Sequence, residues 1–272
     1  MSSTSNQPVG ASALPAIKPL PFGRACLYFG ASALWFRLCV YHLMPGLLRA
    51  GAAPFWAFIS SYTLALTALI VATWLALRKE GYPINYATFR GRLRFAALTY
   101  RGWAWTLSLF VLGFCLTGLL LPAAQVIARL PALAPPSFLP AVLNPLVAQS
   151  ARMTQFMGES LAGQWWLLLL YALFLTVFNL LGEELWFRGY LFPRQQVVHG
   201  SSTWLVHGLL WTLFHVPIYP WYLLYLLPTA LSVSYVAQKT SSSWAAYVVH
   251  GLGNGLLVLV PLTSGVLGNR IE

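Results

Sequence analysis

The stretch Asn179-Leu-Leu-Gly-Glu-Glu-Leu-Trp-Phe-Arg-Gly-Tyr-Leu-Phe192 decides the fold, because it places two adjacent glutamates between apolar runs. Ionised groups inside a membrane segment cost kilocalories each, so they indicate a functional site. On a helix, Glu184 and Arg188 are four residues apart and face each other, which predicts an ion pair. Glu183 points about 100° away and stays free to act as a general base. The alternative is a Glu–Arg pair at a helix end that only fixes the topology.

The composition of the whole chain is that of a membrane protein. Of its 272 residues, 58% are hydrophobic and 8% are charged, whereas soluble domains carry about 25% charged residues. All five acidic residues are glutamates, which excludes a mechanism that needs an aspartate pair. The net charge is +11, but the basic residues gather at the ends of apolar segments, where they meet anionic lipid head groups. We therefore expect membrane lipid as a partner and no nucleic acid.

Seven segments approach the ~20 apolar residues that are needed to cross a bilayer. They are residues 26–46, 54–77, 102–121, 164–186, 203–219, 221–237 and 244–263. The sequence therefore predicts an all-α fold, a polytopic transmembrane helix bundle with about seven (seven or eight) spans. Such a chain is an integral, multi-pass membrane protein, and it lies in the plasma membrane if the source is prokaryotic.

The distribution of Lys and Arg predicts the orientation of these spans, because cytosolic loops are enriched in positive charge. One side holds 11 of them: Lys18, Arg24, Arg78, Lys79, Arg90, Arg92, Arg94, Arg101, Arg188, Arg194 and Lys239. The other side holds four: Arg49, Arg129, Arg152 and Arg270. This excess predicts that the N-terminus lies in the cytosol and the C-terminus outside.

These signals divide the chain into five parts. Residues 1–23 are rich in Ser, Pro and Ala and are expected to form a disordered cytosolic tail. Residues 24–121 carry the N-terminal transmembrane helices. Residues 122–163, with six prolines that break any long helix, form a non-cytosolic loop or lid, and a re-entrant segment or an amphipathic linker stays open. Residues 164–263 form a four-helix core, and residues 264–272 form a C-terminal tail.

Two further groups of polar residues lie in the last predicted spans. His215 sits among apolar and aromatic residues, where it is either an acid–base group or a helix–helix hydrogen-bonding residue. His250 and Asn254 are four residues apart and so share one helix face. An amide there is suited to stabilising an oxyanion, and an imidazole is suited to moving a proton. The alternative is that Asn254 and the glycines Gly251 and Gly255 only hold two helices together.

Together these residues resemble the CPBP family of intramembrane proteases (CAAX protease and bacteriocin-processing, also called Abi), which includes the type II CAAX prenyl endopeptidases. The three family motifs are EExxxR, FxxxH and HxxxN, and the second has Trp here where Phe is usual. The matching residues are Glu183, Glu184, Arg188, Trp211, His215, His250 and Asn254. The resemblance covers about 164–263, and residues 1–163 carry no motif.

The resemblance implies a glutamate-dependent intramembrane endopeptidase, of a class formerly described as metalloproteases. It would hydrolyse a peptide bond in a membrane-associated protein or peptide. Glu183, helped by His215, would activate a water molecule, while His250 and Asn254 would hold the oxyanion. The supporting residues would be Glu184, Arg188 and Trp211.

Metal is not required by this scheme, and no other cofactor is expected. A divalent metal such as zinc, if bound, would be held by Glu183, His215 and His250. Two other functions stay open. One is a non-enzymatic immunity or scaffold protein that retains the family fold. The other is a transporter with a Glu–His proton relay, which is disfavoured because paired broken helices are not found in both halves of the chain.

Overall fold

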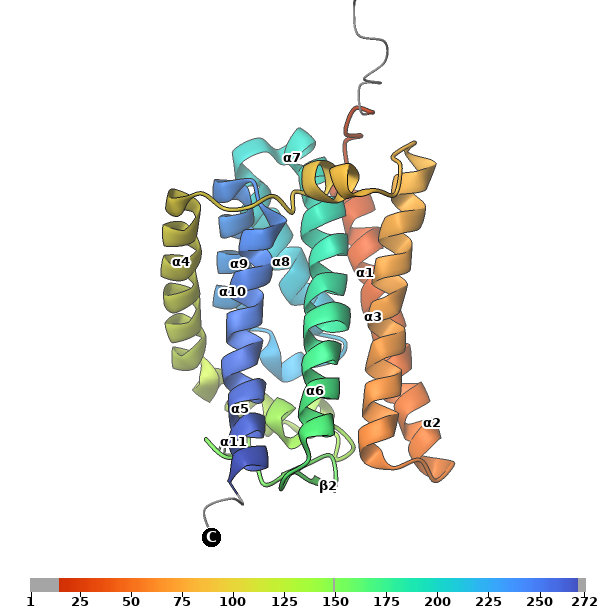
Figure 1. Ribbon diagram of the computed structural model, residues 1–272, viewed down its shortest axis with the longest axis vertical. Coiled ribbons are helices and arrows are strands. Elements are labelled where there is room, and N and C mark those ends of the chain that lie inside the picture. The colour runs from red at the N-terminus through yellow and green to blue at the C-terminus, as the bar shows by residue number, and fades with distance from the viewer. Residues whose placement is uncertain (1–14, 149, 269–272) are drawn as a thin grey trace, which may run out of the picture.

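The computed structural model of the chain describes residues 15–148 and 150–268. Residues 1–14 of the predicted tail and residues 269–272, which include Arg270 of the charge count, lie outside the described residues. The described part is almost wholly helical (Figure 1). Its only strands are β1 (Gln155–Phe156) and β2 (Glu159–Ser160), which pair antiparallel. The predicted all-α helix bundle is confirmed.

The helices follow the chain in the order below, where η marks a 3-10 or π-helical segment. The first half holds α1 Phe22–Leu38, η1 Cys39–Leu43, α2 Met44–Arg49, α3 Pro54–Lys79, η2 Thr88–Arg92, α4 Tyr100–Leu119, α5 Leu121–Ala128, η3 Pro131–Leu133 and η4 Ala141–Leu143. The second half holds α6 Trp165–Leu173, η5 Phe174–Leu181, η6 Glu184–Leu191, α7 Phe192–His199, η7 Gly200–Ser202, α8 Thr203–His215, η8 Pro220–Tyr222, α9 Leu227–Thr240, α10 Ser243–Asn254, η9 Gly255–Leu259 and α11 Val260–Leu267.

Four helical stretches of the described chain are long and apolar enough to cross a membrane. They are Pro54–Lys79, Tyr100–Leu119, Trp165–His215 and Ser243–Leu267. The third stretch reverses direction at Gly200, whose φ of +52° is tolerated because glycine lacks a Cβ. Figure 1 places the start of α1 and the end of α11 at opposite ends of the bundle. The count of seven spans and the cytosolic N-terminus stay predictions.

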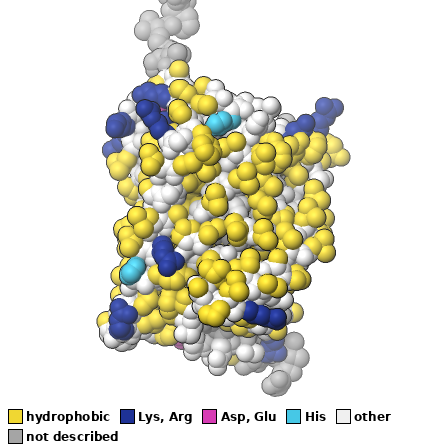
Figure 2. All heavy atoms as spheres, turned by 180° about the vertical axis from the view of Figure 1, so that it is seen from behind, with side chains coloured by type: hydrophobic (Ala, Val, Ile, Leu, Met, Phe, Trp, Pro, Cys, Tyr) yellow, Lys and Arg dark blue, Asp and Glu magenta, His cyan; other side chains and the backbone are white. Residues whose placement is uncertain are grey.

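The surface has the character expected of a chain in lipid. Seen from behind in Figure 2, a wide band of apolar side chains covers the middle of the molecule, and most Lys and Arg lie near its two ends. At the upper end in Figure 1, Glu80 lies 3.6 Å from both Arg92 and Arg194, and all three side chains are buried. The basic loops are therefore tied to the bundle by a buried carboxylate.

The residues just before α1 are held in place. Leu20 is fully buried, and its N–H donates to the Arg194 carbonyl at 2.9 Å. Arg194 in turn donates from Nε to the Lys18 carbonyl at 3.1 Å. Residues 15–21 thus differ from the disordered tail that the composition predicts, because one buried leucine, one backbone hydrogen bond and one hydrogen bond from the Arg194 side chain hold them against α7.

The predicted fifth and sixth spans, 203–219 and 221–237, are shorter helices than expected. Helix α8 has 13 residues and α9 has 14. At 1.5 Å per residue each is about 20 Å long, which is short of the ~30 Å hydrocarbon core. Residues 216–226 join α8 to α9. In Figure 1 this connection turns back before it reaches the level at which α6 and α11 end. The pair is a hairpin that reverses inside the bundle.

Helix α1 and the segment η1 that follows it support this turn from one side. Arg37 donates from NH1 to the carbonyl of Pro217, and the Tyr41 hydroxyl donates to the carbonyl of Ile218 at 2.6 Å. Backbone carbonyls at the end of a helix have no helical partner, and lipid offers them none. Arg37 and Tyr41, both inside the predicted first span, thus each give a hydrogen-bond donor to one backbone carbonyl of the α8–α9 turn.

The Pro-rich segment 122–163 lies below the same turn. Trp221 Nε1 and the Tyr222 hydroxyl both donate to the carbonyl oxygen of Leu143, at 3.0 and 3.1 Å. These two hydrogen bonds therefore hold the segment against the α8–α9 hairpin. The three forms that the sequence left open for this segment, a lid, a re-entrant segment or an amphipathic linker, stay predictions.

Candidate active site

The glutamate pair lies in the middle of a long helix. The chain is helical from α6 through η5, η6 and α7, that is over residues 165–199, so Glu183 lies 18 residues after Trp165 and 16 before His199. The sequence predicted that this span ends at residue 186, near the surface. The helix continues because Arg188, which reads as a charge at a membrane border, is buried and paired inside the bundle.

Glu184 is the centre of a buried ion network. Its Oε1 lies 3.2 Å from Arg188 NH1 and 3.0 Å from His250 Nδ1. The predicted Glu184–Arg188 ion pair is present, and both side chains are fully buried. A carboxylate only accepts hydrogen bonds when ionised, so His250 carries its hydrogen on Nδ1 in this contact. Glu184 thereby fixes which nitrogen of His250 faces the rest of the site.

Glu183 is held by two neutral donors. Asn179 Nδ2 donates to Oε1 at 3.0 Å, and Trp211 Nε1 donates to Oε2 at 3.1 Å. The Trp211 ring also lies 3.9 Å from the guanidinium carbon of Arg188. Trp in place of the Phe of the second motif therefore adds a hydrogen bond to the candidate base, which a phenyl ring cannot make.

His215 is the last residue of α8. Its Nδ1 lies 2.8 Å from the Trp211 carbonyl, so Nδ1 carries the hydrogen and Nε2 is left as an acceptor. In the described structure no direct hydrogen bond joins His215 to Glu183. Both residues border the same cavity, and the ring of Trp211 lies edge-on to that of His215, with centroids 4.9 Å apart.

His250 and Asn254 share one face of α10, as their spacing predicts. Asn254 Nδ2 lies 3.0 Å from Asn179 Oδ1 and 3.3 Å from His250 Nε2. Both amide hydrogens of Asn254 are therefore engaged. An oxyanion at this point has to replace Asn179 Oδ1 or His250 Nε2 as their acceptor. Of the two predicted helix-packing glycines, Gly251 fits this role, because a Cβ there would lie 3.0 Å from Leu180 Cδ1.

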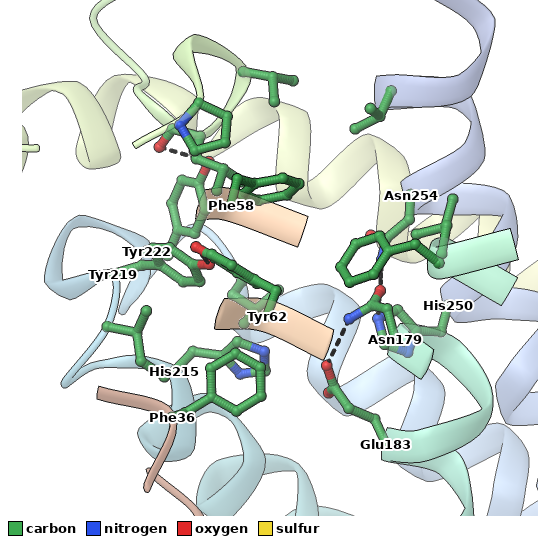
Figure 3. A pocket seen from close by; sticks show the side chains of 18 of the residues that line it. Phe36, Phe58, Tyr62, Asn179, Glu183, His215, Tyr219, Tyr222, His250 and Asn254 are labelled. Carbon is green, nitrogen blue, oxygen red and sulfur yellow. Dashed lines mark hydrogen bonds between the residues drawn. The ribbon is translucent and has the colours of Figure 1, made fainter. Parts of the chain in front are cut away.

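These groups border a cavity of about 180 Å³, which has room for several water molecules (Figure 3). The polar side is lined by Asn179, Glu183, His215, His250 and Asn254. The apolar side is lined by aromatic residues: Phe36, Phe58, Tyr62, Phe156, Tyr171, Phe174, Trp211, Phe214, Tyr219 and Tyr222. Pro140, Val142 and Leu143 of the Pro-rich segment close it from below. The structure thus brings all four predicted catalytic residues to one cavity.

Sequence reasoning missed several polar residues of this cavity, among them Asn179, Tyr62 and Tyr219. Asn179 stands four residues before Glu183, a spacing that places both on one helix face, and this signal was available. Tyr62 and Tyr219, whose hydroxyls lie 2.5 Å apart, are separated by 157 residues. Tyrosines are common in membrane spans, so nothing in the sequence singled them out.

The donors are not arranged as a metal site. Among the described residues, no group of three His, Cys, Asp or Glu side chains is placed to hold a metal ion. The conditional set Glu183, His215 and His250 therefore does not form a ligand shell in this conformation. Both Glu183 oxygens are engaged by Asn179 and Trp211.

A buried glutamate, two histidines and an amide thus surround one cavity in a bundle of apolar helices. Residues 164–256, 93 of the 272, match the family model described as Rce1-like, type II CAAX prenyl endopeptidase. The predicted resemblance is confirmed, and the match contains every motif residue.

The matched model is that of an endopeptidase family, and it covers about a third of the chain. The long apolar helices indicate an integral membrane protein. Comparison with curated proteins finds no match. Comparison with solved structures likewise finds none.

Proposed function

We propose that the protein is an intramembrane endopeptidase in which Glu183 activates the attacking water. The observation that carries this proposal is the division of labour between the two adjacent glutamates. Glu184 is committed to Arg188 and His250, whereas Glu183 has neutral donors alone and borders the cavity. A general base must reach the water in that cavity without being neutralised by a permanent ion pair.

The bond changes follow from this placement. Glu183 removes a proton from the water as the water oxygen bonds to the scissile carbonyl carbon, and the carbonyl oxygen becomes an oxyanion. When the tetrahedral intermediate collapses, the C–N bond breaks and Glu183 returns the proton to the leaving nitrogen. One residue thus serves as base and then as acid, and no proton is left over.

The oxyanion is the charge that the site must stabilise. Asn254 supplies an amide hydrogen to it once the substrate oxygen displaces Asn179 Oδ1 or His250 Nε2. His250 is held on Glu184 through its Nδ1 hydrogen, so its Nε2 accepts from Asn254 and orients that amide toward the oxyanion. In a cavity with aromatic walls and few waters, such fixed donors act more strongly than in bulk water. His215 Nε2 is an acceptor suited to orienting the attacking water.

The test is cleavage of a quenched-fluorescent peptide library by detergent-purified wild-type protein and the Glu183→Gln variant. We expect wild-type cleavage and a loss of about 10²- to 10⁴-fold in the variant, because glutamine keeps the shape but cannot take the proton. The matched control is Glu159→Gln on β2, which does not line the cavity and should cleave normally. Normal cleavage by Glu183→Gln would overturn the mechanism.

A further inference from the structure

Two tyrosine hydroxyls meet at the apolar side of the cavity. Tyr62 comes from α3 and Tyr219 from the α8–α9 turn, and their oxygens lie 2.5 Å apart. Both side chains are buried and both line the cavity. In Figure 3 the pair lies across the cavity from Asn179 and Glu183, with His215 below and between them. The cavity therefore has two polar ends.

One of the two hydroxyl hydrogens of this pair is not used in the contact between the two tyrosines. Each phenol carries one O–H, and only one of the two hydrogens can lie between the oxygens. Neither hydroxyl has another hydrogen-bond partner in the described part of the chain. A donor that is left unsatisfied in an apolar wall is unfavourable. The second hydrogen is therefore available to a group inside the cavity, and donation between the phenols makes it a stronger donor.

Two neighbouring hydroxyls at this end of the cavity already have hydrogen-bond partners. The Tyr222 hydroxyl donates to Leu143, and Thr229 is paired with Thr117 at 2.7 Å. The tyrosine pair thus offers a hydrogen donor to a molecule bound at this side of the cavity. A peptide that enters from water or lipid brings carbonyl oxygens that need such a donor.

We propose that the Tyr62–Tyr219 hydroxyl pair is a substrate subsite, which donates a hydrogen bond to a main-chain carbonyl oxygen next to the scissile bond. The subsite rests on the proposed peptidase function. Binding one carbonyl at the tyrosine end fixes which peptide bond lies beside Glu183 at the other end. The pair therefore sets the register of cleavage, independently of the side chains of the substrate.

The experiment pairs a change in the protein with a change in the substrate. The proteins are wild type, Tyr62→Phe, Tyr219→Phe and the double variant, with Tyr235→Phe, which does not line the cavity, as the control. The substrates are one library peptide that the wild type cleaves and a series in which each non-scissile carbonyl in turn is reduced to a methylene. Tryptophan fluorescence and gel filtration check that each variant is folded.

We expect one reduced peptide of the series to lose about two- to tenfold in kcat/KM with the wild type, the effect of one neutral hydrogen bond. The double variant should lose the same factor on the parent peptide and nothing more on that reduced peptide. The Tyr235→Phe control should match the wild type. The affinity of both peptides for Glu183→Gln protein, with and without the two Phe substitutions, should show the same pattern.

The outcomes separate the subsite from the proposed function. If the wild type cleaves the parent peptide but the double variant loses activity equally on every peptide, the tyrosines have only a structural role and the subsite is overturned. If the double variant cleaves all peptides like the wild type, the subsite is likewise overturned. If Glu183→Gln cleaves normally, the proposed role of Glu183 fails, and the comparison of the parent and reduced peptides still decides the subsite by itself.

Discussion

Replacing Arg188 by methionine tests how the charges of the site are balanced. Arg188 and Glu184 are fully buried, 3.2 Å apart, and the same Glu184 oxygen accepts from His250. Methionine keeps a long, flexible and apolar side chain but removes the cation. Glu184 then remains as a buried carboxylate with His250 as its sole close donor among the described residues.

The magnitude follows from this burial. Removing one partner of a buried ion pair costs about 3–5 kcal/mol, because the other charge stays desolvated and unpaired. The cation–π contact of Arg188 with Trp211, at 3.9 Å, is also lost, and the free-energy cost of this loss is included in that range. Glu184→Gln should lower the free energy of unfolding by a similar amount, since it leaves the buried guanidinium of Arg188 without its carboxylate. The double variant, in which both charges are gone, should cost less than the sum by about 2 kcal/mol or more.

The assay is reversible unfolding of the purified protein in mixed micelles, followed by tryptophan fluorescence, for the two single variants and the double variant. Arg129→Met, which removes an exposed arginine at the end of α5, is the matched control and should stay within about 0.5 kcal/mol of the wild type. If Arg188→Met unfolds within about 1 kcal/mol of the wild type, or if the two single effects simply add, the reasoning about the network is wrong.

The other predictions concern activity. Trp211→Phe removes one of the two donors to Glu183, so we expect kcat to fall by about tenfold or more with KM unchanged, and steady-state kinetics decide; an unchanged kcat would contradict a positioning role. A chelator should leave wild-type cleavage unchanged, and a loss that zinc restores would refute this. Arg37→Met should lower kcat by loosening the α8–α9 turn at Pro217, while Arg37→Lys should restore part of the activity.

The local features of the site could be read from the sequence. The Glu184–Arg188 pair and the shared face of His250 and Asn254 depend on helical spacing alone, which the chain order fixes. The role of Trp211 could not be read in this way. As a motif residue it is one aromatic in place of another, and its N–H gains meaning only when Glu183, 28 residues away, lies beside it.

The short helices α8 and α9 escaped prediction for a physical reason. Hydropathy reports how apolar a segment is, and residues 203–237 are apolar whether they cross the bilayer or reverse inside it. The charge count does not distinguish the two cases either, because residues 216–226 contain no Lys or Arg. Both ends of the hairpin also lie on the same side in either case. The turn becomes visible only through its contacts with Arg37, Tyr41 and Leu143.

The depth of Glu183 in its helix limits which proteins can be cut. The 16 residues to His199 and the 18 residues to Trp165 correspond to about 24 and 27 Å along the helix axis. A fully extended chain advances about 3.3–3.6 Å per residue, so a substrate arriving from either end must send in roughly seven or more unstructured residues. A compact folded domain has no such free length. If the proposed function holds, we expect substrates that are flexible tails or segments already lying within the bilayer.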